Sequence, residues 1–255
     1  MKICDLYAFL EEKIPSSLSC SWDNDGLMCC HDKNAEVRRV LVALDITGKI
    51  VEKAIAESYD LIVAHHPLVF SPLRSVTPDD HVAKKLIDLL RAGVSAMSFH
   101  TRLDAIAGGV NDVLAAALGL ENVEPFGEGG EAIGRIGELP EAMSLDEFAE
   151  LVKGATDADS ILIADAGRPV HRVAILGGSG SSEVDAARRA GADTYLSGEL
   201  KYNHLTDAPE CGINLLAAGH FHTEHPVCRR IKELLLEADA TLCVDIAVSN
   251  EIRVL

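Results

Sequence analysis

The sequence repeats one pattern of buried strand, amphipathic helix and buried strand, and this repeat constrains the fold more than any other feature. The first copy covers residues 38–64 and the second covers residues 171–202. Such a strand–helix–strand unit pairs its two strands in parallel, because the helix crosses over between them. Two aligned pairs share an offset of 133 residues: Arg39 with Arg172, and Asp60 with Asp193. The sequence therefore predicts an α/β fold of two similar lobes, produced by internal duplication, with mixed or parallel sheets flanked by helices.

A third strand in each copy ends in a histidine that is followed four positions later by a carboxylate. Residues 94–104 match residues 216–224 at an offset of 120. The aligned pairs are His100 with His220, and Asp104 with Glu224. Because the offset falls from 133 to 120, the first copy carries about 13 extra residues, which we assign to the proline-containing loop 71–80.

The two lobes are predicted to cover residues 1–125 and 126–255. The boundary falls near the glycine-rich, charged segment Gly127–Glu131, which reads as a linker or loop. Shortly after it, Ser144 and Glu147 have the spacing of a capping box ahead of an apolar-periodic helix.

Composition indicates a globular protein that does not cross a membrane. With 255 residues, 48% of them hydrophobic, the chain is long enough for real cores. Its apolar runs fall far short of the roughly 18 residues that a membrane span needs. The first residues carry charges and form an amphipathic pattern that ends near Pro15, so they do not resemble a signal peptide. We expect a cytoplasmic location.

The charge balance favours cations over polyanions as partners. The formal net charge is −17, and binding of bulk nucleic acid normally rests on Lys and Arg that neutralise phosphates. Acidity can equally serve solubility alone. The seven cysteines form an odd number with no C-x-x-C pair, so we expect free, reduced thiols and no zinc ribbon.

The stretch L-I-V-A-H-H-P-L-V-F places two adjacent histidines where a buried strand ends. His65 and His66 follow four apolar residues and precede Pro67, which biases the residue before it toward an extended backbone. Taken alone, one histidine could be a hydrogen-bonded core residue and the other a turn residue. Two imidazoles at a strand exit can also bind metal ions.

Three predicted strand exits together supply four histidines and two carboxylates: His65 with His66, His100 with Asp104, and His220 with Glu224. In open α/β sheets, ligands bind beyond the carboxyl ends of the strands. If the exits converge, two ions could each take about three protein ligands, bridged by a carboxylate or water at about 3.5–4 Å between the metals. Imidazole with carboxylate suits Zn, Mn, Fe, Co or Ni and does not select among them.

Simpler interpretations exist for the individual motifs. A single His-x-x-x-carboxylate is more often a chance pairing on a helix face or turn, and only its recurrence in both lobes beside a histidine pair favours metal binding. His222 and His225 are further histidines in the same segment, equally explained by a solvated loop. The segment Ser21–Leu27, which carries the only tryptophan, has ordinary turn chemistry. The loop Gly177–Ser182 could approach a phosphate but lacks P-loop spacing, so a tight turn is at least as reasonable.

These motifs, taken in order, resemble the GTP cyclohydrolase 1 type 2 proteins, the Nif-three-like family of dinuclear-metal-centre hexameric proteins. The resemblance spans nearly the whole chain through W-D-N-D-G-L, L-D-I-T, A-H-H-P-L-V-F, H-T-R-L-D-A-I-A-G-G-V-N-D, G-G-S-G, S-G-E-L-K-Y and G-H-F-H-T-E. It implies five metal ligands: His65, His66, Asp104, His220 and Glu224. It also implies that His100 lies beside the site, and that the subunits form a toroidal homohexamer with metal sites facing an internal cavity.

The chain departs from the family pattern at two places. Family members commonly read Lys-Tyr-His-Asp after the strand of the second lobe, whereas this chain has Lys-Tyr-Asn-His at 201–204. Arg102 also stands where a polar uncharged residue is common. Neither departure touches the implied ligands, but both bear on what the cavity binds. The chain also lacks the inserted domain of some longer members.

The function that we predict is metal-dependent hydrolysis at a dinuclear centre. Two ions would lower the pKa of a water molecule and polarise the bond that it attacks. Asp104 and Glu224 would anchor the ions and could bridge them, and either His100 or another residue of the cavity would transfer protons. The resemblance implies a small-molecule substrate, either a purine nucleotide such as GTP or a phosphate ester. The alternative is a non-catalytic ring protein that presents or buffers divalent metal; a catalytic site, by contrast, keeps an open coordination position.

Overall fold

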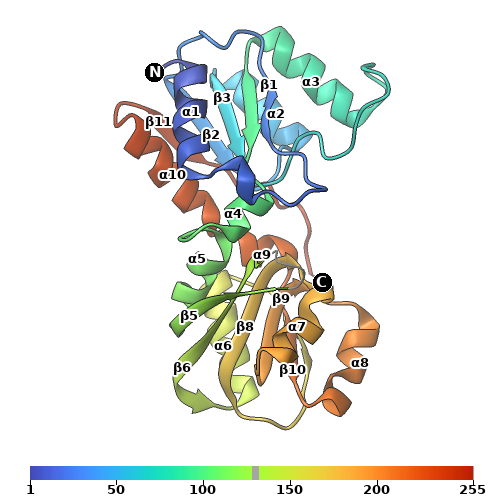
Figure 1. Cartoon of the computed structure of the whole chain (residues 1–255). Coiled ribbons are helices and arrows are strands. Elements are labelled where there is room, and N and C mark those ends of the chain that lie inside the picture. Colours follow the sequence, from blue (N-terminus) through green and yellow to red (C-terminus); the bar gives the residue numbers. More distant parts are fainter. Residues whose placement is uncertain (128–131, 255) are drawn as a thin grey trace. The chain divides into compact units, whose positions relative to one another are not determined.

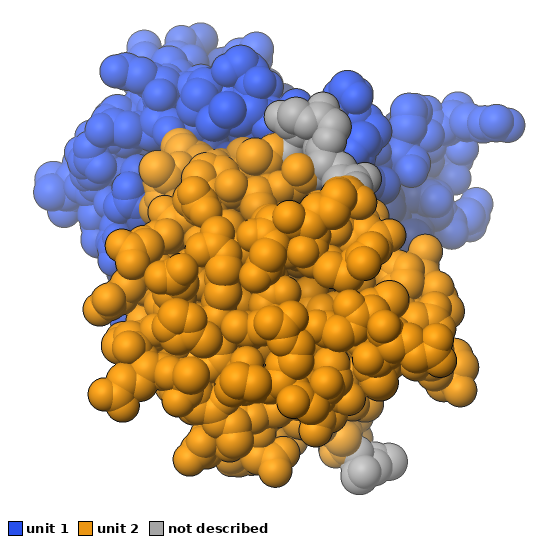
Figure 2. Space-filling model, turned by 60° about the horizontal axis from the view of Figure 1, so that its bottom comes forward, with its two compact units in different colours: residues 1–103, 227–251 blue, residues 104–226, 252–255 orange. Residues whose placement is uncertain are grey.

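The computed structural model describes residues 1–127 and 132–254. Contacts divide the chain into two compact units, coloured separately in Figure 2. Unit 1 comprises Met1–Leu103 and Val227–Glu251, and unit 2 comprises Asp104–Pro226 and the residues from Ile252. These ranges differ from the lobes predicted at 1–125 and 126–255, because the compact units follow which strands pair and not the order of the repeat. Of the predicted linker Gly127–Glu131, residues 128–131 lie outside the described residues.

Unit 1 contains a five-stranded sheet in the order β1-β4-β3-β2-β11 (Figure 1). Its strands are β1 (Gly26–Cys29), β2 (Arg39–Ala43), β3 (Leu61–Ala64), β4 (Ser95–Ser98) and β11 (Cys243–Ile246). All neighbours pair in parallel except β1, which is antiparallel to β4. Every residue of β3 and β4 is buried, as expected for parallel strands covered on both faces.

The sheet of unit 1 is accompanied by four helices of eight residues or more: α1 (Ile3–Lys13), α2 (Gly48–Ala56), α3 (His81–Ala92) and α10 (Val227–Ala238). The first ends before Pro15, as predicted. Thr47 caps α2 through its side chain, and Asp80 caps α3 by accepting two backbone N–H groups. Apolar residues of α2, such as Ile50 and Ala54, pack into the same buried cluster as Leu41 and Ile62 of the sheet.

Unit 2 contains a six-stranded sheet in the order β5-β6-β8-β9-β10-β7. Its strands are β5 (Glu121–Phe126), β6 (Gly134–Met143), β7 (Leu162–Ala164), β8 (Val170–Ser179), β9 (Thr194–Glu199) and β10 (Asn214–Ala217). The central strands β8, β9 and β10 pair in parallel, and the outer neighbours pair antiparallel. Mixed sheets flanked by helices in both units confirm the predicted fold class.

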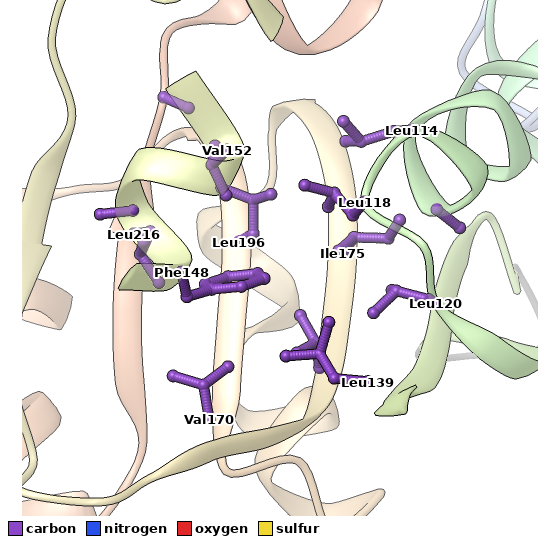
Figure 3. Packing of buried hydrophobic residues seen from close by; sticks show 14 of the residues in the cluster. Leu114, Leu118, Leu120, Leu139, Phe148, Val152, Val170, Ile175, Leu196 and Leu216 are labelled. Atoms are coloured by element: carbon purple, nitrogen blue, oxygen red, sulfur yellow. The ribbon is translucent and has the colours of Figure 1, made fainter. Parts of the chain in front are cut away.

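The helices of unit 2 cover its sheet and include a predicted capping box. They are α5 (Val110–Ala117), α6 (Leu145–Thr156), α7 (Val184–Arg189), α8 (Tyr202–Cys211) and the short α9 (His220–Glu224). Figure 3 shows Phe148 and Val152 of α6 packed beside Leu196 of the sheet. The Ser144 side chain accepts the N–H of Glu147, whose carboxylate accepts the N–H of Ser144 in return. Among the helices in the described parts of the chain, none is both long and apolar enough to cross a membrane.

The internal repeat is visible in both pairing and hydrogen bonding. Strands β2, β3 and β4 adopt the same order and parallel pairing as β8, β9 and β10. Asp60 accepts two bonds of 2.8 Å from the backbone N–H groups of residues 38–39. Asp193 accepts bonds of 3.1 and 2.7 Å from residues 171–172. Residues related by the offset of 133 therefore form the same hydrogen bonds in the two units.

The third strands of the two repeats, β4 and β10, correspond at an offset that is one residue smaller than the offset between the histidines that follow them. Leu61 pairs with Ser95 in unit 1, and Thr194 pairs with Asn214 in unit 2. Since 214 − 95 equals 119, the strand offset is one smaller than the offset of 120 between the histidines. The extra residue is Gly219, which has a φ of +88°. The predicted offset of 120 therefore holds for the histidines but is wrong by one position for the residues of the two strands.

The additional length of the first copy lies where the sequence predicts it. In unit 1, β3 ends at Ala64 and α3 begins at His81, whereas in unit 2 β9 ends at Glu199 and α8 begins at Tyr202. The long connection 65–80 contains the predicted loop 71–80. It also contains both histidines of the His-His-Pro motif.

Candidate metal centre

His65 lies directly after β3 and is fully buried. Its Nδ1 lies 3.0 Å from the carbonyl oxygen of Phe99, the residue that follows β4. A carbonyl oxygen only accepts hydrogen bonds, so Nδ1 must carry the ring proton. In the neutral ring the lone pair then resides on Nε2, which is the atom suited to bind a metal ion.

His66 is oriented in the same way by a carboxylate. Its Nδ1 lies 2.7 Å from Oδ1 of Asp45, which follows β2. The other carboxylate oxygen of Asp45 accepts a 2.8 Å hydrogen bond from the Ser249 hydroxyl. The Asp45 carboxylate is therefore held by Ser249 as well, and it accepts the hydrogen bond from the Nδ1 proton of His66.

His100 is held by the turn segment that precedes β1. Its Nδ1 lies 2.8 Å from Oδ1 of Asp23, and its backbone N–H donates to Asp25 at 3.0 Å. Asp23 also accepts bonds from the backbone N–H and hydroxyl of Thr101, at 3.0 and 2.6 Å. Burial raises the pKa of Asp23, but the hydrogen bonds from His100 and Thr101 outweigh this and hold its pKa well below the usual range.

The three oriented histidines converge within unit 1. The ring centroids of His65 and His66 lie 4.9 Å apart, and those rings lie 5.2 and 5.6 Å from the ring of His100. One ligand atom from each lies within 4.8 Å of the others. Histidines that bind metals in proteins typically donate their second ring N–H to a carboxylate or carbonyl, as all three do here. Three imidazoles with this support form a possible metal site.

Unit 2 brings together the other predicted ligands. Nε2 of His220 lies 3.1 Å from Oε2 of Glu224, one helical turn away on α9, and its Nδ1 lies 3.3 Å from Oε1 of Glu199. A carboxylate oxygen of Asp104, on α4 (Thr101–Ala105), lies within 4.8 Å of one from Glu224. Both carboxylates are nearly fully buried. Buried carboxylates this close repel each other unless a proton or cation neutralises them, so the donor set fits a divalent cation.

The glycine-rich segment at the end of β8 makes room for this group. A Cβ added at Gly178 would lie 2.1 Å from Oε1 of Glu224 and 3.0 Å from Nε2 of His220, and Gly178 has a φ of +65°. The loop Gly177–Ser182 therefore lets α9 approach the sheet closely. The N–H groups of its three glycines donate to side chains of Asn111, Thr223 and Ser197 at 2.8–3.1 Å. These amides are engaged within the protein, which favours the tight-turn interpretation over phosphate binding.

The remaining candidates have structural surroundings. The ring of His222 lies over Gly219, where an added Cβ would come within 3.0 Å of it, and His225 packs on Phe221 with centroids 4.6 Å apart. Arg102 is buried in unit 1, where it pairs with carboxylates of Glu11 and Asp25. The charge of Arg102 is therefore paired within unit 1, with the buried Asp25 and the partly exposed Glu11.

Sequence reasoning identified the ligand candidates but missed the carboxylates that orient them. His65, His66 and His100 meet in unit 1, and Asp104, His220 and Glu224 meet in unit 2. Asp23, Asp45 and Glu199 were not assigned a role. Asp45 stands at a strand exit in L-D-I-T, a position that could have marked it as a partner of the adjacent exit.

The fold and the donor set define a mixed α/β protein with a possible metal site built from histidine and carboxylate side chains. The sequence model of the Duf34/NIF3 (NGG1p interacting factor 3) family matches residues 1–253. The chain belongs to this family, which confirms the resemblance drawn from its motifs.

Named relatives and solved structures agree with this assignment. A protein named GTP cyclohydrolase 1 type 2 homolog from Nostoc sp. is 35% identical over 246 residues, which cover 92% of this chain and 91% of the relative. A protein of the same name from Clostridium acetobutylicum is 32% identical over 232 residues, covering 89% and 86%. The structure of reduced HcgD from Methanocaldococcus jannaschii is 30% identical, with a TM-score of 0.85 and 98% of both chains covered. A Bacillus cereus protein related to NIF3 is 25% identical, with a TM-score of 0.89 and 100% and 99% covered.

Proposed function

We propose that the chain is a metal-dependent hydrolase that uses two divalent ions to act on a small molecule, either a purine nucleotide or a phosphate ester. The observation that carries this proposal is the set of three histidines in unit 1 whose Nδ1 atoms are all held by carboxylate or carbonyl oxygens. These hydrogen bonds place polar groups in the protein interior. Such an arrangement is expected where metal-binding side chains must be held in a defined orientation. The two buried carboxylates in unit 2 add the negative charge that divalent ions require, and His220 adds a nitrogen ligand.

The residues divide by role in this proposal. His65, His66, Asp104, His220 and Glu224 bind the ions, which supply Lewis acidity and lower the pKa of water when bound. Nδ1 of His100 retains its proton and donates it in a hydrogen bond to Asp23, so Nε2 can accept a proton from the attacking water. Glu224 is fixed by packing over Gly178 and holds its carboxylate in one orientation.

The substrate class rests on two supports. The relatives that match this chain over most of their length are named GTP cyclohydrolase 1 type 2 homolog, and this name favours a purine nucleotide. A chain with a formal charge of −17 repels an anionic substrate unless bound cations compensate, so phosphate-bearing substrates require the metal.

Metal analysis and turnover assays on the same samples test this function. The purified protein is stripped, reloaded in turn with Zn, Mn and Fe, and assayed with GTP and with phosphate esters. We expect about two ions per chain and turnover that disappears in His65→Ala and Glu224→Gln, the second variant preserving side-chain shape. The exposed His171→Ala is the matched control. Absence of metal-dependent turnover contradicts the enzyme proposal, and full metal content without turnover favours the non-catalytic metal-binding alternative.

We also propose that the chain works as a homohexamer, on the strength of the sequence resemblance. Light scattering on the purified protein then gives six times the chain mass of 27.3 kDa. A mass of one or two chains at micromolar concentration contradicts the proposal.

A further inference from the structure

Two large aromatic side chains of unit 1 stand exposed to solvent beside the histidine cluster. Trp22, the only tryptophan of the chain, is 58% exposed, and Phe70 is 51% exposed. Exposed aromatic side chains retain much unfavourable contact with water, and they are enriched where a ligand covers them. Among the other described residues, Tyr202 of unit 2 is a similarly exposed aromatic residue.

The rings of Trp22 and Phe70 adjoin a candidate catalytic residue as well as each other. Their centroids lie 6.2 Å apart, and each lies 6.1 Å from the ring of His100. The three ring planes meet at steep angles of 61–82°, so each ring meets its neighbours in edge-on geometry. In an edge-on pair the edge of one ring lies against the face of the other, so these contacts cover only part of each ring. The half of Trp22 and Phe70 that is exposed offers surface to a stacking partner.

Both rings are held by the segments that hold the histidines. Trp22 immediately precedes Asp23, the carboxylate that orients His100, and Phe70 lies four residues after His66. The two segments are joined to each other by a hydrogen bond of 2.5 Å from the Asn24 side-chain amide to the carbonyl oxygen of Val69. The backbone segments that carry the two rings are therefore tied to each other and to the histidines.

We propose that Trp22 and Phe70 form an aromatic platform that binds the planar heteroaromatic ring of the substrate while its reacting group lies at His65, His66 and His100. The inference rests on the proposed function for the position of the reaction. It goes beyond that function by selecting, from nucleotides and simple phosphate esters, the substrates that carry a ring. Every nucleobase offers a π-face, so stacking accepts any planar base. The platform therefore gives affinity for an aromatic ring but little selectivity between one base and another.

A second copy of this chain is a less suitable occupant of the platform. Two aromatic side chains bury at most about 250 Å² each, and half of each is already covered. This falls below the roughly 800 Å² per partner of a specific protein interface. A single nucleobase, by contrast, covers a surface of this size.

Fluorescence of Trp22 tests the platform without reliance on turnover. The full-length, metal-loaded protein is titrated with guanosine, which has a ring and no phosphate, and with ribose 5-phosphate, which has a phosphate and no ring. We expect saturable quenching of Trp22 by guanosine and none by ribose 5-phosphate. Phe70→Leu keeps an apolar side chain but removes the ring, and it should weaken guanosine binding by about 5- to 100-fold, the loss expected for one stacking contact.

Matched variants separate stacking from other effects. Tyr202→Ala removes from unit 2 an aromatic ring that is even more exposed, at 81%, and should leave guanosine affinity unchanged. Unchanged guanosine affinity in Phe70→Leu overturns the platform, and so does equal binding of ribose 5-phosphate and guanosine 5′-monophosphate by calorimetry. If Phe70→Leu alters only the mass measured by light scattering, the rings belong to a contact between copies and the proposal fails. These results stand whether or not the protein turns over GTP.

Discussion

Replacement of Arg102 by methionine should destabilise unit 1 strongly, because Arg102 is the cation of a buried ion network. The side chain is 1% exposed. Its Nε donates to Asp25 at 2.9 Å, its Nη1 donates to the Ile14 carbonyl at 3.0 Å and to Glu11, and the guanidinium lies 4.7 Å from the ring centroid of Phe99. Methionine retains much of the volume and removes the charge, so packing loss is small and the main effect is electrostatic.

The magnitude follows from the exposure of the partners. Asp25 has a side chain that is 5% exposed, so it would lose its cation in a site that water barely reaches. Removing one member of a buried ion pair costs about 3–5 kcal/mol, because the remaining charge is left buried. Glu11 is 26% exposed and regains some hydration, so it adds little to this figure. We expect a loss of roughly 3–5 kcal/mol in the free energy of unfolding.

The pH dependence gives this prediction a definite sign. Burial raises the pKa of Glu11, while hydrogen bonds from Tyr7 and Arg102 lower it, with a net decrease. A carboxylate whose folded pKa is lowered stabilises the protein above its unfolded pKa of about 4.3, and this contribution is lost as the pH falls through the folded value. Without Arg102, protonation of Glu11 relieves its repulsion with the nearby carboxylate of Asp25. The difference between wild type and variant should therefore shrink as the pH falls below about 4.3.

Urea unfolding at pH 7 and at about pH 3.5, below the unfolded pKa of Glu11, measures both effects. Arg230→Met is the matched control, because Arg230 forms an exposed pair with Glu233 at 3.4 Å and should cost under about 1 kcal/mol. The reasoning is refuted if Arg102→Met is no more destabilising than Arg230→Met, or if the deficit grows at low pH.

Three further predictions concern backbone, thiol and cap. Gly178→Ala should lower stability by more than about 1 kcal/mol, because it combines a left-handed φ with a clash, whereas Gly154→Ala in an open helical position should be neutral or stabilising in the same urea assay. Burial raises the pKa of the Cys228 thiol to about 12, so mass spectrometry after brief iodoacetamide treatment should find the exposed Cys211 alkylated and Cys228 unmodified. Ser144→Ala removes a capping box and should cost about 1 kcal/mol of unfolding free energy.

The parts of the fold that were predictable are those encoded in local pattern. The offset of 133 residues held because Asp60 and Asp193 each close the start of the preceding strand with the same backbone hydrogen bonds. The capping box at Ser144 was equally local. The pairing of β11 with β2 was not predictable, since a four-residue strand carries no signal for a partner more than 200 residues away.

The sequence pointed to the histidines and carboxylates that the structure brings close together, but it did not point to the residues that orient them. His65, His66 and His100 stand at strand exits, which parallel topology gathers at one edge of the sheet. Asp23 was interpreted as a turn residue, and its bond to His100 spans 77 positions of sequence. A turn-forming aspartate and a histidine-orienting aspartate have the same local sequence, so only the tertiary structure separates them.

The late position of β11 in the chain has a consequence for biosynthesis. The strands of unit 2 lie between residues 121 and 217, so they are all available before β11 emerges from the ribosome. The sheet of unit 1 lacks its edge strand until residues 243–246 are made. Ser249, which fixes the carboxylate that orients His66, emerges after them. In the nascent chain the Asp45 carboxylate beside His66 thus lacks its hydrogen bond from Ser249. The histidine cluster reaches its final geometry only once translation has passed residue 249.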